Sequence, residues 1–244
     1  MSLAVDLARA ADPVVLAHTV GMRPDRWQAE VLRSGAPRTL LNCCRQSGKS
    51  TTAALMAVHQ AVYSPGSLVL VVTPAQRQSI ELVRTCTAFA RHVAKAQETV
   101  LQLSFENGSR IIALPGSEAT VRGYAGVDLL VIDEAAWVAD DLYTAVRPML
   151  AVSDGRLIAM STPHGKRGWW SDEWHDLRRD WDRVKVTADQ VPRISPAFLE
   201  AERAALGPWR FSQEYMGEFV SSDEALFSNE ELDAALAPVE GTTL

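Results

Sequence analysis

Uninterrupted apolar segments alternate along this chain with longer segments of helical pattern. The apolar segments cover residues 38–43, 67–73, 129–132 and 156–160. The helical segments between them cover about 49–63, 74–94 and 140–150. Strands that are apolar at every position, rather than at alternate positions, are typical of a parallel sheet with helices over both faces. The pattern therefore predicts an α/β fold built on a mainly parallel sheet.

Two other regions depart from this alternation. Residues 99–105 and 109–114 flank Asn107-Gly108, a dipeptide that strongly favours a two-residue hairpin turn, so we expect an antiparallel pair of strands there. Ahead of the first apolar segment, residues 1–35 have a helical pattern that ends at Gly35.

The character of the chain changes after Pro163. Residues 164–227 hold five of the seven Trp and many charged residues, but no apolar segment comparable to the earlier ones. We therefore expect a core over 1–163, a smaller subdomain beside the sheet over 164–227, and a linker or tail over 228–244.

Composition and charge limit the classes of function. The formal net charge is −6, which argues against a protein whose whole surface coats nucleic acid, because phosphate neutralisation needs clustered Lys and Arg. A local basic face is compatible with this charge. No apolar segment approaches the roughly 20 residues that span a bilayer, and the N-terminus lacks the pattern of a signal peptide, so we expect no membrane partner. The three cysteines lack metal-ligand spacing, which favours reduced thiols in a cytosolic protein.

A short polar loop joins the first predicted strand to the helix that follows it. In this context backbone N–H groups and the helix N-terminus bind phosphates. We therefore assign ATP binding to Gln46, Ser47, Gly48, Lys49, Ser50 and Thr51. Lys49 is expected to reach the β- and γ-phosphates, and the Ser50 hydroxyl to bind Mg²⁺. Cys43 stands where such loops usually begin with glycine, and the alternative interpretation is a solvated glycine turn capped by serine.

An acidic pair ends the third apolar segment. Asp133 and Glu134 directly follow four apolar residues, and parallel sheets have their ligand sites at the carboxyl ends of the strands. We expect Asp133 to hold Mg²⁺ through water and Glu134 to act as the general base on the attacking water. Together with the loop, this pair indicates a hydrolysing NTPase.

Three further positions have two interpretations each. Arg45 within the loop is either a sensor of the γ-phosphate or the partner of a neighbouring carboxylate. Ser161 and Thr162, after the next strand, either lie beside the γ-phosphate and couple its loss to the rest of the chain, or form a turn before Pro163. Gln28 either hydrogen-bonds adenine or is a surface residue of a helix.

Taken together, these segments resemble the large terminase subunit of tailed bacteriophages, in its N-terminal ATPase domain. The resemblance covers about residues 20–225 and rests on the following motifs, in order: Trp27-Gln28, Arg45-Gln46-Ser47-Gly48-Lys49-Ser50, Val72-Thr73-Pro74, Arg122-Gly123-Tyr124, Val131-Ile132-Asp133-Glu134-Ala135-Ala136 and Ser161-Thr162-Pro163. Several of these motifs also occur in superfamily 2 helicases, so their order and the arginine in the loop are the specific part.

The resemblance implies a RecA-like P-loop ATPase core with a lid subdomain. It implies a motor that couples ATP hydrolysis to translocation of double-stranded DNA into a procapsid, as a homo-oligomeric ring, with a pentamer as the expected form, on the portal protein. The small terminase subunit is a further implied partner, and the cytoplasm of the infected bacterial host is the implied location. Arg122 falls where the family has an arginine proposed to reach a neighbouring subunit's ATP site, and a DNA-phosphate or surface contact is its alternative.

The family also carries a C-terminal nuclease domain with an acidic metal cluster. The acidic residues after position 222 are typical of a solvated linker, so we expect no nuclease activity from this chain. The basic residues among Trp169, Trp170, Trp174 and Trp181 are a candidate DNA or subunit contact, although the Trp spacing favours packing. The alternative enzyme is a superfamily 2 helicase-like DNA translocase, and the alternative of another class is a nucleotide-gated binding module without turnover.

Overall fold

One mixed sheet of eight strands organises the computed structural model, which describes residues 3–116, 121 and 123–220. The strand order is β3-β4-β5-β2-β6-β7-β1-β8. The strands are β1 (Arg38–Cys43), β2 (Leu68–Thr73), β3 (Ala96–Glu98), β4 (Gln102–Phe105), β5 (Arg110–Pro115), β6 (Leu129–Asp133), β7 (Arg156–Ser161) and β8 (Asp182–Val186). All pairs from β5 to β8 in this order are parallel, and β3 and β4 form an antiparallel edge. The predicted mainly parallel α/β fold and the hairpin at Asn107-Gly108 are thus confirmed.

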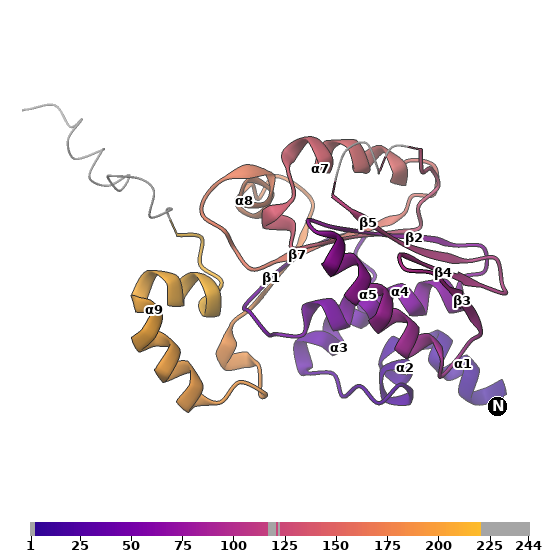
Figure 1. Ribbon diagram of the computed structural model, residues 1–244, viewed down its shortest axis with the longest axis horizontal. Helices are drawn as coiled ribbons and strands as arrows, with labels where there is room; N and C mark the ends of the chain where they lie inside the picture. The colour runs from indigo at the N-terminus through magenta and orange to yellow at the C-terminus, as the bar shows by residue number, and fades with distance from the viewer. Residues whose placement is uncertain (1–2, 117–120, 122, 221–244) are drawn as a thin grey trace, which may run out of the picture.

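Helices cover both faces of this sheet, as Figure 1 shows. The α-helices are α1 (Leu3–Ala11), α2 (Pro13–Thr19), α3 (Arg26–Arg33), α4 (Lys49–Tyr63), α5 (Gln76–Ala90), α7 (Asp140–Val146), α8 (Gly168–His175) and α9 (Pro196–Met216). The 3-10 turns are η1 (Ala135–Trp137), η2 (Arg147–Leu150) and η3 (Ala188–Gln190). Helices α1 to α5 lie on one side of the sheet and α7 and α8 on the other. Within the described residues, no helix has the length and apolarity needed to cross a membrane.

The hydrophobic core has two parts, one on each face. Alternate residues of one strand point to opposite faces, so Val71 of β2 packs against α4 and α5 while Leu70 and Val72 pack toward α7 and α8. Because both faces are covered, the central strands are buried at every position. This arrangement explains why their sequences are apolar throughout and holds their carboxyl ends rigidly at one edge.

The segment predicted as a subdomain beside the sheet contributes to the sheet itself. Strand β8 pairs in parallel with β1, and Val186 lies opposite Cys43. The sequence pattern did not indicate this strand, because Asp182–Val186 has no continuous apolar character. As an edge strand, β8 is mostly half-buried or exposed, so it tolerates the charges that hid it in the sequence. The domain boundaries at 163 and 227 stay predictions, and the second lies outside the described residues.

Helix α9 follows β8 and η3 and bends at Gly207, whose backbone (φ 73°, ψ 170°) is not helical. Phe211 and Tyr215 in its second half are buried against the core on the α4 side. This half of α9 therefore docks at the carboxyl end of β1, beside the predicted phosphate loop.

Candidate nucleotide-binding site

The loop between β1 and α4 leaves its amides available for a ligand. Gln46 and Gly48 both have positive φ (58° and 91°), so the backbone turns sharply before α4 begins at Lys49. Helix α4 has no side-chain N-cap and no acidic residue in its first turn. Within the part of the chain that the structure describes, the amides of residues 46–51 donate no hydrogen bond. A 15-residue helix with a free N-terminus is a ready anion site.

Four charged and polar side chains meet in front of this loop. The Lys49 Nζ lies 3.0 Å from Glu134 Oε1, and the Ser50 hydroxyl donates to Asp133 Oδ2 over 2.7 Å. Lys49 and Ser50 are the first two residues of α4. Asp133 is the last residue of β6, and Glu134 follows it directly. The sheet therefore sets the positions of both pairs. Glu134 has a left-handed backbone (φ 52°), an uncommon conformation for a residue other than glycine. The sequence prediction that these four residues converge is met by the geometry, whereas the roles given to them stay predictions.

Burial and mutual attraction set the protonation of this cluster. Burial lowers the pKa of Lys49, but the carboxylates of Glu134 and Asp133 outweigh it, so the net pKa lies above its ordinary value. Lys49 is therefore a cation throughout the neutral range. Burial raises the pKa of Asp133, while Lys49 opposes the increase. A buried carboxylate of this kind is stabilised by a nearby cation.

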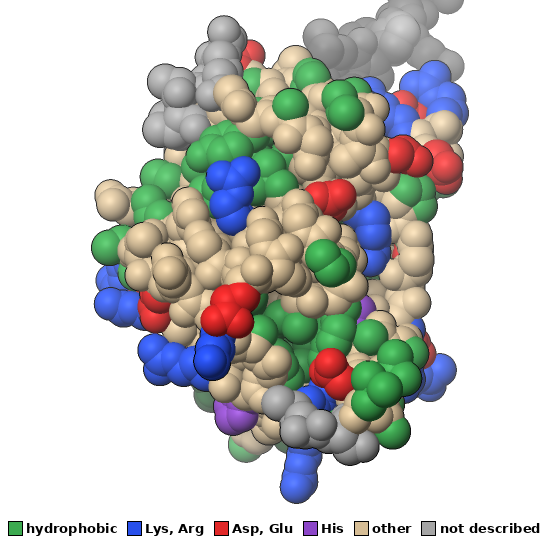
Figure 2. Space-filling view, turned by 90° about the vertical axis from the view of Figure 1, so that its right-hand side faces the viewer, with side chains coloured by type: hydrophobic (Ala, Val, Ile, Leu, Met, Phe, Trp, Pro, Cys, Tyr) green, Lys and Arg blue, Asp and Glu red, His purple; other side chains and the backbone are tan. Residues whose placement is uncertain are grey.

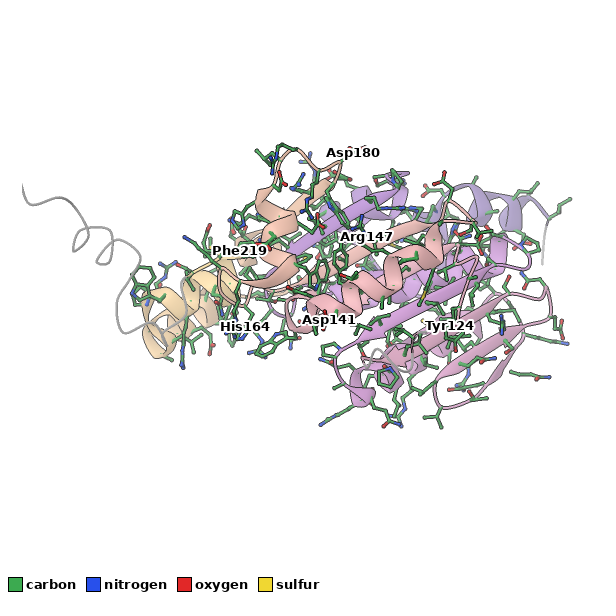
Figure 3. The ribbon with its side chains drawn as sticks, turned by 90° about the horizontal axis from the view of Figure 1, so that it is seen from above. Tyr124, Asp141, Arg147, His164, Asp180 and Phe219 are labelled. Carbon is green, nitrogen blue, oxygen red and sulfur yellow. The ribbon has the colours of Figure 1, made fainter. Side chains whose placement is uncertain are left out.

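A cleft of about 460 Å³ opens beside this cluster. The residues that line it come from the loop and the start of α4, from the ends of β2, β6 and β7 and the segments after them, including α5 and η1, and from α9: Arg45, Gln46, Lys49, Pro74, Ala75, Gln78, Glu134, Trp137, Thr162, Pro163, His164 and Glu214. Trp137 and His164 stack at 3.7 Å between ring centroids and form one wall. In the view of Figure 3, His164 lies between α9 and the start of α7, where Asp141 is labelled. Ser50 and Thr51 line a smaller adjoining recess of about 260 Å³ with Asp133 and Glu134.

Ser161 and Thr162 lie at the end of β7, beside Glu134 and the cleft, and the coupling role stays a prediction. Ser161 Oγ is 3.5 Å from Glu134 Oε2, which is a weak contact, and it donates to the Thr162 carbonyl over 2.8 Å. Among the described residues, the Thr162 hydroxyl is buried without a hydrogen-bond partner, although Thr162 lines the cleft. A buried orphan hydroxyl at a cleft wall fits a site that binds a polar ligand.

Arg45 has a protein partner in this structure. Its Nε lies 3.4 Å from Glu214 Oε2, and its amide donates to the Glu214 carbonyl over 2.9 Å. The Arg45 side chain is 66% exposed and lines the cleft. The ion-pair interpretation is thus observed, and the γ-phosphate contact stays a prediction.

Gln28 is engaged with the loop rather than exposed. It is 2% exposed, its Nε2 donates to Thr52 Oγ1 over 3.0 Å, and its Oε1 accepts from the Asp25 amide over 2.8 Å. The interpretation as a surface residue is wrong, because Trp27 and Gln28 both lie on the buried face of α3. Contact with adenine stays a prediction.

Arg122 lies outside the described residues. The Trp-rich segment packs as expected: Trp169 and Trp170 are buried, and Trp181 donates to the buried Glu173 carboxylate over 2.8 Å.

Sequence reasoning missed Arg193, which donates to the Ser47 carbonyl over 2.7 Å. The signal that could have found it was the alternation in Asp182–Val186, which marks an edge strand leading toward the loop.

The residues present fit a nucleotide with magnesium. Free amides and Lys49 suit phosphate oxygens, and the oxygens of Ser50 and Asp133 are the ligands that Mg²⁺ prefers, with phosphate and water supplying the others. The fold defines an α/β domain of the RecA-like class, with a candidate phosphate-binding loop between β1 and α4. The chain belongs to the family described as terminase large subunit, T4likevirus-type, N-terminal, whose model matches residues 40–234.

Individual relatives agree with this family. The chain is 27% identical over 250 residues to the terminase large subunit of Thermus virus P23-45, covering 86% of this chain and 51% of that protein. The large terminase ATPase domain of Thermus phage P74-26 superposes with a TM-score of 0.73 at 23% identity, covering 84% of this chain and 97% of that one. The ADP complex of the bacteriophage D6E large terminase superposes with a TM-score of 0.68 at 13% identity, covering 81% and 54%. The chain spans about half the length of the curated relatives it matches.

Proposed function

We propose that this chain is an ATP-hydrolysing motor domain that drives the packaging of double-stranded DNA into a procapsid. The observation that carries the proposal is the convergence of Lys49, Ser50, Asp133 and Glu134 beside free loop amides. Family membership adds support, since a solved relative from bacteriophage D6E is described in complex with ADP.

The proposed reaction is an in-line displacement at the γ-phosphorus. A water oxygen forms a bond to phosphorus while the bond to the oxygen bridging the β- and γ-phosphates breaks, and the water proton passes to the Glu134 carboxylate. The products are ADP and inorganic phosphate. Mg²⁺, held by Ser50 and Asp133, would neutralise charge on the phosphate oxygens.

The ion pair between Lys49 and Glu134 gives this site a built-in competition. A phosphate that contacts the Lys49 ammonium competes with the Glu134 carboxylate 3.0 Å away. Exchange of that partner leaves Glu134 free to accept a proton from water. Glu134 is therefore available as the general base chiefly when phosphate is bound, because without phosphate it stays paired with Lys49.

The finer parts of the proposal come from the family. They are the ring of copies on a portal protein, the small terminase subunit as partner and the host cytoplasm as location. The proposal that this chain has no nuclease activity has another source, which is the linker-like pattern of its acidic residues after position 222. The chain's share of these tasks is ATP hydrolysis coupled to movement of DNA.

The test is steady-state ATP hydrolysis by the purified chain with Mg²⁺, alongside ATP binding. Glu134→Gln removes the base but keeps the side-chain shape, so we expect turnover to fall at least about 100-fold while ATP still binds. Lys49→Ala should lose binding as well. Wild-type turnover matched by Glu134→Gln would refute the assignment of the base, and ATP binding without any wild-type turnover would favour a non-hydrolysing module.

A further inference from the structure

Arg193 lies outside the cleft and hydrogen-bonds the backbone of the proposed phosphate loop. Arg193 Nη2 donates to the Ser47 carbonyl over 2.7 Å, and its Nη1 donates to Asp25 Oδ1 over 2.8 Å. The Asp25 side chain is only 11% exposed, so the arginine is anchored against a largely desolvated carboxylate. Arg193 is not among the residues that line the cleft.

Strand pairing brings Arg193 to this position. Because β8 runs parallel to β1, the chain that leaves β8 follows the loop that leaves β1, and the Cys44 amide donates to the Val186 carbonyl over 2.8 Å. The Ile194 amide then donates to the Val191 carbonyl over 3.0 Å and closes a turn around Arg193. Val191 is buried, and Ile194 packs on the same core, so the turn is fixed on both sides of the arginine.

Gln28 holds the next carbonyl of the loop. Its Nε2 lies 3.4 Å from the Gly48 carbonyl, a weak bond, and 3.0 Å from Thr52 Oγ1. A side chain at position 48 would come within 2.9 Å of Gln28 Nε2 and 3.2 Å of Arg193 Nη2. Gln28 and Arg193 thus both press on the outer side of Gly48, and both are tied to Asp25.

The trans peptide bond between Ser47 and Gly48 links the direction of the Ser47 carbonyl to that of the Gly48 amide. In a trans peptide the C=O and the following N–H point in opposite directions, and the described chain contains no cis peptide. When Arg193 holds the Ser47 carbonyl outward, the Gly48 amide is turned away from Arg193. We propose that Arg193, anchored by Asp25, is a positioning residue that aims the Gly48 amide at the phosphates of the nucleotide.

This inference rests on the proposed function, because it needs the loop to bind phosphate. A purely structural ion pair between the turn and α3 would give the same two contacts, so folding stability alone cannot test the idea. The reading that separates the two roles is nucleotide affinity measured on variants that remain folded.

The experiment measures MgATP binding by calorimetry and unfolding by circular dichroism for Arg193→Ala, Arg193→Lys, Asp25→Asn and the double variant Arg193→Ala/Asp25→Asn. We expect Arg193→Ala to weaken binding about tenfold, since the Gly48 amide loses its fixed direction toward the charged phosphates while the loop keeps its Gln28 contact. Asp25→Asn keeps a good helix N-cap and should weaken binding by a similar factor. The double variant should be no weaker than Arg193→Ala, because the two residues act in series.

Controls make each outcome decisive. Arg26→Ala removes an exposed ion pair with Glu30 next to Asp25, and its binding should match the wild type. Arg193→Lys keeps a cation that can reach only one of the two partners, so we expect an affinity between those of the wild type and Arg193→Ala. If Arg193→Ala does not fold, the affinities of Arg193→Lys and Asp25→Asn test the inference instead. Wild-type affinity for MgATP in both Arg193→Lys and Asp25→Asn would overturn the inference. Failure of the wild type itself to bind MgATP, or equal binding by Lys49→Ala, would instead overturn the proposed function.

Discussion

At the scale of single residues, Cys43 is a buried thiol at the point where β1 ends and the loop begins. Cys43 and Cys86 are fully buried, and burial raises the pKa of each to about 12, while it raises the pKa of Cys44 to about 11. The thiolate is the reactive form. A raised pKa keeps these groups protonated at every pH below about 10, so none of them is poised for oxidation or alkylation.

We therefore predict that iodoacetamide at pH 8 leaves Cys43, Cys44 and Cys86 unmodified in the native protein. In denaturant the ordinary pKa returns, and all should be alkylated within the same time. Mass spectrometry after a timed quench measures this. Rapid native labelling of Cys44 would show that its side chain is accessible from the loop, and would contradict the burial described above.

The site shows which residue properties can be read from a sequence. Lys49, Ser50, Asp133 and Glu134 could be predicted, because strand order places their segments at one edge of the sheet whatever the details of packing. The ion pair of Lys49 with Glu134 could not, since it depends on side-chain directions. Arg193 was missed for a different reason: its position depends on an unrecognised strand.

At the scale of elements, that strand is β8. The sequence Asp-Arg-Val-Lys-Val alternates and carries charge because only one side of an edge strand needs burial. The rule that finds the central strands, continuous apolar character, fails at an edge for this physical reason. The antiparallel β4–β5 pair was found because the turn chemistry of Asn107-Gly108 is local and does not depend on burial.

The second half of α9 is the element most closely tied to the loop. Besides the contacts of Glu214 with Arg45, the Gln213 Oε1 accepts from the Gly165 amide over 3.2 Å, and the Asn42 side-chain Nδ2 donates to the Gly217 carbonyl over 2.8 Å. One face of α9 thus contacts the loop, the end of β1 and the segment after Thr162. A movement of the loop or of the segment after Thr162 would therefore change contacts with α9.

We predict that Glu214→Gln strengthens MgATP binding by up to about fivefold, the equivalent of the 0–1 kcal/mol typical of an exposed ion pair. The substitution removes a carboxylate that lines the cleft and competes for Arg45, while the backbone bond to the Arg45 amide stays. Titration calorimetry at low and high salt measures the effect, which should shrink as salt screens it.

The matched control is Glu218→Gln, whose carboxylate pairs with Lys185 at 2.6 Å and does not line the cleft. Its affinity should equal that of the wild type. Weaker binding in Glu214→Gln would mean that the carboxylate holds α9 and the loop together, rather than drawing Arg45 away from phosphate.

At the scale of the whole molecule, charge gives little sign of a broad DNA-binding face. The net charge is −6, and on the face in Figure 2 basic and acidic side chains are interspersed. The basic residues of the Trp-rich segment are partly neutralised, since Arg178 and Arg179 both pair with Asp176. If the chain moves DNA as proposed, this surface predicts contact through a narrow patch or through several copies acting together.

The proposed ring would place a second copy beside the ATP site, where it could supply an arginine. In the described residues, Arg45 is the arginine that lines the cleft, and Glu214 already occupies it. If Arg122 of a second copy reaches the site, ATP turnover per chain should increase with protein concentration. Arg122→Ala should then lower turnover about 10³-fold or more at any concentration, the lower end for an arginine finger supplied in trans.

The measurement is the ATPase rate per chain across a wide range of concentrations, with Arg84→Ala as a control, because Arg84 forms an exposed pair with Glu81 on α5. A second experiment mixes Arg122→Ala with Glu134→Gln. Each variant supplies what the other lacks, so partial recovery of turnover is expected only if the arginine acts between copies. Turnover that is flat in concentration and unchanged in Arg122→Ala would mean that each copy works alone, and Arg45 would then be the arginine to substitute.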